Sequence, residues 1–449
     1  MANKNTYNQA KRAAKKYPAA AMIIAILLVI IIASIAIFWV LRPDIFHIYV
    51  GTGSHVWSED GSDGWAISKQ VNVCENGVKE RECLWCGYTE YDIIKATEKH
   101  SLDDETKICT VCGFDGNAKE LSIHFLELGN KYTGDCTLIK CGDTEVLIDA
   151  GSRQNSAETI KAYVDQYCED GKLEYVIVTH AHQDHIAGFV GNSIKNSDKK
   201  TGILYQYEIG TIIQFAGHNT TSTIYKNYVQ AVDYAKDNGA KVYTAKECRE
   251  QTNGARYEYY LDEETQTVSM TILDSYYYYN ETKDENDYSV CMLLSQEIGG
   301  GSKNYLFTGD LEEKGESYLV DRNDLPQVDL FKGGHHGSYT ASTEKLLKVI
   351  KPKNVAVCCC CGTTEYTSNK RNTFPAQAFI NRVAVYTKKI YCTTLIVDYK
   401  AGKYQSMNGN IMFYTEGGEL KVNCSNNDTI LKETAWFKEN RTWPTTGVQ

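Results

Sequence analysis

The sequence predicts an α/β fold for the larger part of the chain, from about residue 119 to residue 449. Two observations predict it. Short apolar runs rich in β-branched residues, such as residues 175–178, alternate with segments of helical periodicity, such as residues 159–168. Several of these runs end abruptly in histidine, aspartate or glycine. Binding and catalytic residues often lie on loops that follow the strands of a rigid scaffold, so these strand ends are candidate site positions.

The composition limits the classes of protein that the chain can represent. A length of 449 residues allows two or three domains, and a hydrophobic fraction of 43% is enough for a real core. The net charge of −10 provides no global basic field that would draw the protein to nucleic acid. The 16 cysteines have spacings that differ between regions, which indicates several separate roles rather than one disulfide framework.

The first 41 residues predict a membrane anchor. Five basic residues between residues 4 and 16 precede an uncharged run, residues 18–41, and a helix needs about 20 apolar residues to span a bilayer. The positive-inside rule then assigns residues 1–17 to the cytoplasm and everything after the run to the outer side of the cell membrane. Because the run ends in Ile-Phe-Trp-Val-Leu, which does not suit cleavage, we expect one uncleaved anchor, with a cleaved signal peptide as the alternative.

Residues 43–118 form a cysteine-rich spacer. Two Cys-x-x-Cys-Gly knuckles are separated by 22 residues, which matches the spacing of a four-cysteine zinc site. We therefore expect a structural zinc ion bound by Cys83, Cys86, Cys109 and Cys112. The stretch resembles the zinc-ribbon-like repeats of bacterial surface proteins, and disulfides are the alternative outside a cell.

A dense cluster of ligand-type residues follows the strand predicted at residues 175–178. His180, His182, Asp184 and His185 lie within six positions. Imidazoles and a carboxylate suit a borderline metal such as Zn²⁺, and mixed nitrogen and oxygen ligands with an open position are typical of a catalytic site. His180 and His182 can point the same way if the strand geometry persists, while Asp184 and His185 lie past the bend and could serve a second ion.

Three other strand ends carry further candidates. One apolar run ends in Asp149-Ala-Gly, another in Thr-Gly-Asp310, and a third leads to Gly-His335-His336-Gly. Each aspartate alone would be an ordinary turn residue. Adjacent histidines between glycines are harder to explain by packing.

The segment from His180 to His185 resembles the HxHxDH signature of the metallo-β-lactamase superfamily, and the other strand ends follow in that family's order. The resemblance implies a four-layer αβ/βα sandwich over residues 119–449 that holds two zinc or manganese ions. Asp149 would then accept a hydrogen bond that orients the metal-binding loop, and Asp310 would bridge the two ions. The metal ligands that the resemblance implies are His180, His182, Asp184, His185, His218, Asp310 and His335.

Two of these assignments leave alternatives open. His218 is the only histidine between His185 and His335, so it is the sole histidine candidate for the third ligand of the first ion. A surface-loop histidine is the alternative. His335 follows from register with the common Gly-His pattern, and His336 would then face the substrate or be the ligand instead.

Within the superfamily, the chain resembles the hydrolase domain of ComEC-type competence proteins, the DNA-uptake channels of transformable bacteria. Gly134-Asp135, residues 286–289, residues 306–310 and residues 332–338 carry this resemblance, which is collinear from residue 121 to about residue 415. Two features depart from it. The chain has no multi-span channel, and residues 369–375 lack the histidine of the branch's Asn-x-x-x-His-Pro segment, which puts substrate positioning there in doubt.

These features predict a bacterial, single-pass membrane protein whose extracytoplasmic domain is a metal-dependent hydrolase. Two ions would lower the pKa of a shared water, and the resemblance implies an anionic phosphodiester or nucleic-acid substrate. The expected catalytic residues are Asp184, Asp310, His336 and Lys332. Six basic residues between 345 and 371 could hold a polyanion or form a solvated helix face. A choline-phosphate esterase, a lactamase and a non-enzymatic surface-binding module are the alternatives.

Four consecutive cysteines, residues 358–361, predict a core strand in which cysteine serves as a small hydrophobe. Disulfide geometry prevents all four from pairing locally. A further zinc site is the less favoured alternative.

Overall fold

The computed structural model describes residues 55–59, 62–69, 77–85, 87, 89–94 and 121–449, apart from residues 196–197, 264, 299–300 and 417. The predicted boundary near residue 118 lies outside these residues and stays a prediction. The two large sheets lie wholly in the compact unit that contains residues 91–449.

Three short strands precede the large sheets. β1 (Ala66–Lys69), β2 (Gly77–Glu82) and β3 (Thr89–Ile94) form a sheet in the order β1-β2-β3. Arg81 donates to Glu90 through Nε and Nη2, at 2.8 and 2.6 Å. Cys83 is buried, while Cys86, Cys109 and Cys112 lie outside the described residues, so the structural zinc ion stays a prediction.

The predicted membrane anchor, residues 18–41, also lies outside the described residues. None of the helices in the described part of the chain has the length and apolar character that crossing a membrane requires. This finding contradicts the predicted localisation, a single-pass membrane protein with a cytoplasmic N-terminus and an extracytoplasmic catalytic domain.

The first large sheet contains eight strands in the order β19-β18-β4-β5-β6-β7-β8-β9. Its strands are β4 (Leu121–Phe125), β5 (Thr137–Cys141), β6 (Thr144–Ile148), β7 (Lys172–Val178), β8 (Glu208–Gln214), β9 (Lys241–Thr244), β18 (Ile411–Glu416) and β19 (Glu419–Cys424). From β6 to β9 the neighbours pair in parallel. The predicted strand at residues 175–178 is the buried end of β7.

The second large sheet also contains eight strands, in the order β10-β11-β12-β13-β14-β15-β16-β17. Its strands are β10 (Glu258–Tyr260), β11 (Val268–Ile272), β12 (Met292–Ile298), β13 (Gly301–Phe307), β14 (Leu330–Lys332), β15 (Asn354–Cys361), β16 (Ile390–Asp398) and β17 (Lys403–Ser406). From β13 to β16 the neighbours pair in parallel. Parallel pairing requires crossover segments, which the helices supply.

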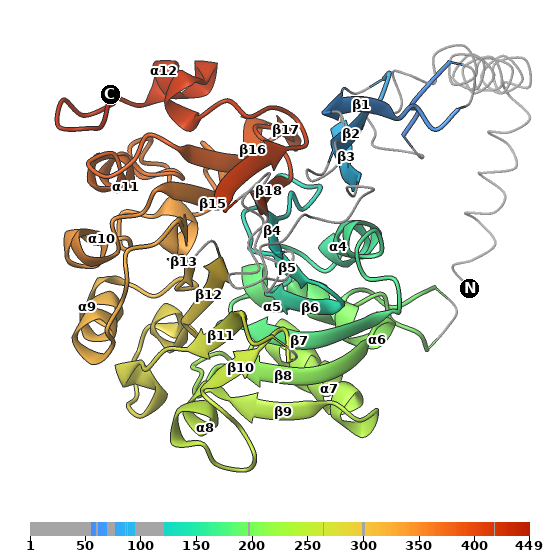
Figure 1. Cartoon of the computed structure of the whole chain (residues 1–449), viewed down its shortest axis with the longest axis vertical. Coiled ribbons are helices and arrows are strands. Elements are labelled where there is room, and N and C mark those ends of the chain that lie inside the picture. Colours follow the sequence, from blue (N-terminus) through green and yellow to red (C-terminus); the bar gives the residue numbers. More distant parts are fainter. Residues whose placement is uncertain are drawn as a thin grey trace, which may run out of the picture. The chain divides into compact units, whose positions relative to one another are not determined.

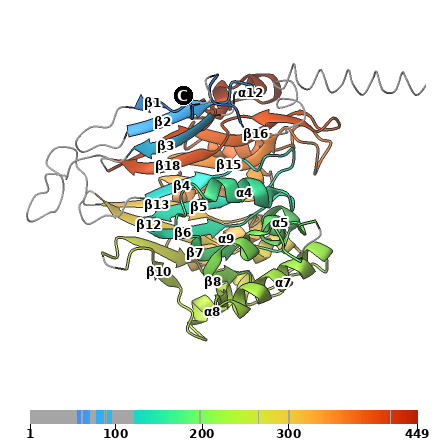
Figure 2. The ribbon, with the colours of Figure 1, turned by 90° about the vertical axis from the view of Figure 1, so that its right-hand side faces the viewer.

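Helices cover the outer face of each sheet (Figures 1 and 2). One group is α4 (Ser156–Val164), α5 (Gln183–Val190), α6 (Ile203–Gln206) and α7 (Thr223–Asp237). The other is α9 (Glu313–Arg322), α10 (Glu344–Ile350) and α11 (Gln377–Val383), and shorter pieces are α8 (Ala245–Glu250) and α12 (Ala435–Asn440). Between the sheets, the rings of Phe125 and Phe307 stack with centroids 6.2 Å apart. The four-layer αβ/βα sandwich is therefore confirmed.

Candidate metal centre

The candidate residues follow the carboxyl ends of two pairs of neighbouring parallel strands. β6 ends directly before Asp149, and its parallel neighbour β7 ends shortly before His180. β13 ends shortly before Asp310, and its parallel neighbour β14 ends shortly before His335. Because carboxyl ends of parallel strands lie at one edge of a sheet, each sheet brings two of the four segments to the site.

Asp149 joins the ends of β6 and β7. Its Oδ1 atom accepts a hydrogen bond from the backbone N–H of Thr179 at 2.8 Å, and its Oδ2 atom accepts one from the Thr179 hydroxyl at 2.7 Å. The same Oδ2 lies 2.8 Å from Nδ1 of His185. Asp149 has φ of 57°, a left-handed conformation that is uncommon outside glycine. This geometry is the one expected of a carboxylate that orients a ligating histidine.

The histidines after β7 are arranged around the start of α5. His182 is the N-cap of α5, so Asp184 and His185 lie in its first turn. His180 Nε2 lies 3.0 Å from His182 Nδ1. The helix start is pressed against the end of β6: a Cβ atom at Gly151 would lie 1.6 Å from the carbonyl oxygen of Asp184. Burial lowers the pKa of His180 well below its ordinary value, so its imidazole is neutral, the form that binds metal.

Three histidine side chains lie close to one carboxylate oxygen of Asp310. Its Oδ2 atom lies 3.1 Å from Nε2 of His185, 3.1 Å from Nε2 of His336 and 3.8 Å from Nε2 of His335. The imidazoles form a continuous row in the order His182, His180, His185, His336, His335, with successive centroids 4.8, 4.1, 5.2 and 5.9 Å apart. The structure thus brings together residues from all four strand ends.

The two adjacent histidines differ in position. Both have positive φ, 46° for His335 and 53° for His336, a strain that is typical of functional sites. His336 is 1% exposed, and its Nδ1 donates to the carbonyl oxygen of Cys358 at 2.9 Å, which leaves Nε2 facing Asp310 and Asp184. His335 is only partly buried, and its Nδ1 lies 3.2 Å from Glu312. The geometry thus favours His336 over His335 as the ligand from this segment, against the sequence-based choice.

Lys332, one of the expected catalytic residues, lies beside the centre, but its side chain is engaged within the protein. It is 3% exposed, and its Nζ lies 2.5 Å from Oδ2 of Asp135. Asp135 also lies 3.0 Å, through Oδ1, from Nδ1 of His336. Lys332 therefore offsets a buried carboxylate instead of facing a substrate. Asp135 was not among the predicted site residues, although Gly134-Asp135 carried part of the family resemblance.

The carboxylates of the centre stabilise positive charge on its buried histidines. Burial alone would lower the pKa of His185, but the carboxylates of Asp310 and Asp149 raise it well above its ordinary value. The pKa of His336 is raised in the same way by Asp310 and Asp135. Burial would raise the pKa of Asp310, yet the charges of His185, His336 and His335 hold it well below its usual range.

The residues present fit a divalent metal. Atoms of Asp135, His185, Asp310 and His336 lie within 4.8 Å of one another, and all four residues are buried. Oδ1 of Asp310 is buried and has no hydrogen-bond donor among the described residues. Imidazole nitrogens and carboxylate oxygens are ligands that Zn²⁺ and Mn²⁺ accept. A buried Asp/His site for divalent cations is therefore present.

His218 is not brought to this centre. It is exposed, its Nδ1 lies 3.2 Å from the carbonyl oxygen of Thr220, and its ring lies against Tyr225 with centroids 4.2 Å apart. The prediction that it is a metal ligand is not supported, because its side chain is engaged on the surface of the segment before α7.

The open side of the centre is formed by partly exposed residues. His182 and His335 are partly buried, and Tyr366, which is 52% exposed, donates from its hydroxyl to Oδ2 of Asp184 at 2.5 Å. The same loop continues to Lys370 and Arg371, both exposed and without an ion pair in the described part of the chain. Neither Tyr366 nor Glu312 carries a sequence signal that could have marked it.

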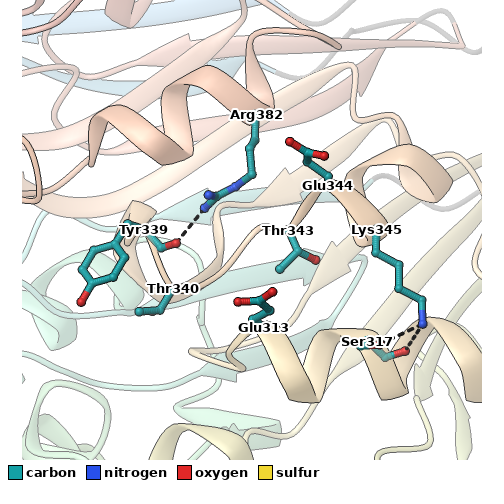
Figure 3. Close-up of a pocket in the computed structure, with 8 residues that line it drawn as sticks. All are labelled: Glu313, Ser317, Tyr339, Thr340, Thr343, Glu344, Lys345 and Arg382. Carbon is teal, nitrogen blue, oxygen red and sulfur yellow. Dashed lines mark hydrogen bonds between the residues drawn. The ribbon is translucent and has the colours of Figure 1, made fainter.

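Thr340 is one of the residues that line a separate surface pocket of about 350 Å³ (Figure 3). The Thr340 hydroxyl lies 3.1 Å from Nδ1 of His335. Two of the pocket's cationic side chains are already engaged. Arg382 donates to the carbonyl oxygens of Tyr339 and Ala341, and Lys345 donates to Ser317 and Asp321. The pocket therefore offers little free positive charge.

The residues of the centre lie in two stretches of the chain that match a known family. Residues 129–191 and 295–361 match the family model of the metallo-β-lactamase superfamily. A stretch of 71 residues is 35% identical to Recombination protein 2 of Haemophilus influenzae, which is 16% of this chain and only 8% of that relative's length.

Solved structures give weaker matches. A Cronobacter sakazakii metallo-β-lactamase is 13% identical, with 45% of this chain and 72% of that chain covered and a TM-score of 0.26. Unliganded yeast PDE1 is 11% identical, with 58% and 81% covered and a TM-score of 0.28.

Proposed function

Because the chain carries a metal-dependent hydrolase domain of the metallo-β-lactamase superfamily, we propose that it is a phosphodiesterase whose substrate is an anionic phosphodiester, nucleic acid above all. The observation that carries the proposal is the exposed loop that begins at Tyr366. It contacts Asp184 in the centre and presents Lys370 and Arg371 to solvent a few residues away. Exposed cations on a loop that contacts a metal centre suit a polyanionic substrate.

Two divalent cations, zinc or manganese, would supply Lewis acidity and an activated water at this centre. We assign His180 and His182 to the first ion. Asp184, His185 and His336 would hold the second, and Asp310 would contribute to both. Asp135 lies beside the second set and is held by Lys332.

The chain's own residues fix the orientation of these ligands. Asp149 accepts the Nδ1–H of His185, and the Cys358 carbonyl oxygen accepts the Nδ1–H of His336, so both Nε2 atoms point toward Asp310. Such partners select the tautomer that a metal requires.

His335 has the position of a proton donor. Its Nδ1 lies 3.2 Å from Oε1 of Glu312 and its Nε2 points toward Asp310 from the open side of the centre. The oxygen that leaves a phosphodiester needs a proton, and a histidine paired with a carboxylate can hold and release one. We assign this role to His335.

The relative in Haemophilus influenzae supports a nucleic-acid substrate, because recombination is a process of DNA. The matched stretch is a small part of that protein, so the support extends to the substrate class alone.

The test is hydrolysis of bis(p-nitrophenyl) phosphate, single-stranded and double-stranded DNA and RNA by the purified chain with zinc or manganese. We expect metal-dependent turnover of at least one of these and its loss in Asp310→Asn. No turnover on any of them with either metal would overturn the proposal.

One alternative has an observation in its favour. Glu312 and Asp284 place carboxylates near His335, and an acidic rim suits a cationic group such as choline. Hydrolysis of p-nitrophenyl phosphorylcholine, with none of the diesters above cleaved, would favour a choline-phosphate esterase.

A further inference from the structure

A second cluster of metal-ligand side chains lies away from the histidine and aspartate centre. β15 runs through four consecutive cysteines, and side chains alternate between the faces of a strand. Cys358 packs into the core between the two sheets, whereas Cys359 and Cys361 pack on the opposite face, which α9, α10 and α11 cover. Cys392 of β16 belongs to the same outer cluster.

The sulfur atoms of this outer cluster lie close together. The Sγ atoms of Cys359 and Cys361 are 3.6 Å apart, and Sγ of Cys361 is 3.7 Å from Sδ of Met407. The Sγ atoms of Cys359, Cys361 and Cys392 all lie within 4.8 Å of one another. A tetrahedral ion with metal–sulfur bonds of about 2.3 Å requires sulfur–sulfur distances of about 3.8 Å. The sulfur–sulfur distances in the cluster therefore match those of a tetrahedral metal site.

A buried positive charge accompanies the sulfurs. Arg441 is 8% exposed and donates to the backbone carbonyl oxygens of Thr373 and Pro375, but no carboxylate pairs with it in the described part of the chain. Its guanidinium interacts electrostatically with Cys361 and Cys359. A buried guanidinium without a counter-ion calls for negative charge nearby.

We propose that Cys359, Cys361 and Cys392, with Met407 as a fourth sulfur, bind one thiophilic divalent cation, Zn²⁺, at a site separate from the hydrolase centre. Binding converts three thiols to thiolates and releases three protons. The resulting unit carries one negative charge, which Arg441 offsets. A monovalent ion such as Cu⁺ would leave a second negative charge uncompensated in the core, so the charge balance favours a divalent ion.

The site would be structural. All four sulfur residues are at most 5% exposed, which leaves no open position for a substrate. The ion would crosslink β15 and β16 with the segment of Met407, which follows β17. The hydrolase centre contacts the same strand through the carbonyl oxygen of Cys358, whose side chain faces away from the outer cluster.

The test exchanges Co²⁺ into the purified full chain and measures thiolate-to-cobalt charge-transfer absorption in the near ultraviolet. Histidine and carboxylate ligands do not give this absorption. The variant is Cys361→Ser and the matched control is Cys360→Ser, the neighbouring buried cysteine of the same strand. Cysteines elsewhere in the chain contribute equally to both, so the comparison isolates the outer cluster.

We expect Cys361→Ser to lose part of the absorption and one bound metal per chain by elemental analysis, while Cys360→Ser retains both. Met407→Leu should keep the metal but shift the absorption. This second variant tests the site even if Cys361→Ser fails to fold. Equal absorption and equal metal content in wild type, Cys361→Ser and Met407→Leu would overturn the proposal, because the cluster would then be a set of packed thiols only.

Discussion

Nδ1 of His185 lies 2.8 Å from Oδ2 of Asp149, and both side chains are buried. This contact fixes which nitrogen of His185 faces Asp310. Loss of such a partner lowers metal affinity about 10–100-fold in metal sites. Asp149→Asn should therefore weaken metal binding by that factor, as measured by competition with a chromogenic chelator. Unchanged affinity would show that Asp149 does not orient His185.

The two adjacent histidines should respond differently to substitution. His336→Ala removes an Nε2 atom 3.1 Å from Asp310 and should abolish binding of one ion, as measured by isothermal titration with Mn²⁺. His335→Ala should retain both ions but lower kcat, because we assign it the proton transfer. The reverse pattern would return the ligand role to His335.

Lys332 should be required for folding stability rather than for substrate binding. Breaking a buried ion pair by removing one partner typically costs about 3–5 kcal/mol, because the other charge is left uncompensated. Lys332→Met should lower the free energy of unfolding by about that amount in urea denaturation. Adding Asp135→Asn to Lys332→Met should recover part of the loss, and a Lys332→Met chain as stable as wild type would contradict the burial of this pair.

The metal-free chain should become less stable as pH rises above neutrality. A histidine whose pKa folding raises stabilises the folded chain fully below its unfolded pKa, about 6.5, and loses that contribution as pH rises through its folded value. His185 and His336 are such groups. With chelator present, the melting temperature should fall between pH 7 and pH 9, above the range in which His180, whose pKa folding lowers, has the opposite effect. His336→Ala should show a smaller fall, and a wild-type melting temperature that rises over this interval would contradict the prediction.

The loop after Tyr366 should discriminate between substrates by charge. Lys370→Gln with Arg371→Gln should raise KM for single-stranded DNA and leave KM for bis(p-nitrophenyl) phosphate unchanged, since the small diester is expected to bind at the metal centre without contacting these two side chains. Lys348→Gln with Lys351→Gln on and after α10 is the matched control, because it removes the same charge from other exposed positions. Equal effects of the two pairs would indicate a general electrostatic field instead.

The sequence predicted the strand ends well, and for a local reason. Each of Asp149, His180 and Asp310 follows a continuous apolar run, so the change from buried strand to polar loop is visible in a short window. The choice between His335 and His336 depends on left-handed backbone at both residues, which flanking glycines permit but do not specify.

Long-range relationships were not predictable. Lys332 is buried because it meets Asp135, which lies on a segment of the other sheet, and no local pattern links the two. His218 was chosen as the only available histidine, yet its position depends on packing against Tyr225. Tyr366 reaches Asp184 through a loop whose course only the fold determines.

The most direct test of the account is electron paramagnetic resonance of the Mn²⁺-loaded chain, since Asp310 is proposed to join two ions at one centre. We expect the signal of an exchange-coupled pair in the wild-type chain, and the loss of that coupling in Asp310→Asn. A spectrum of isolated Mn²⁺ ions alone in the wild-type chain would contradict it.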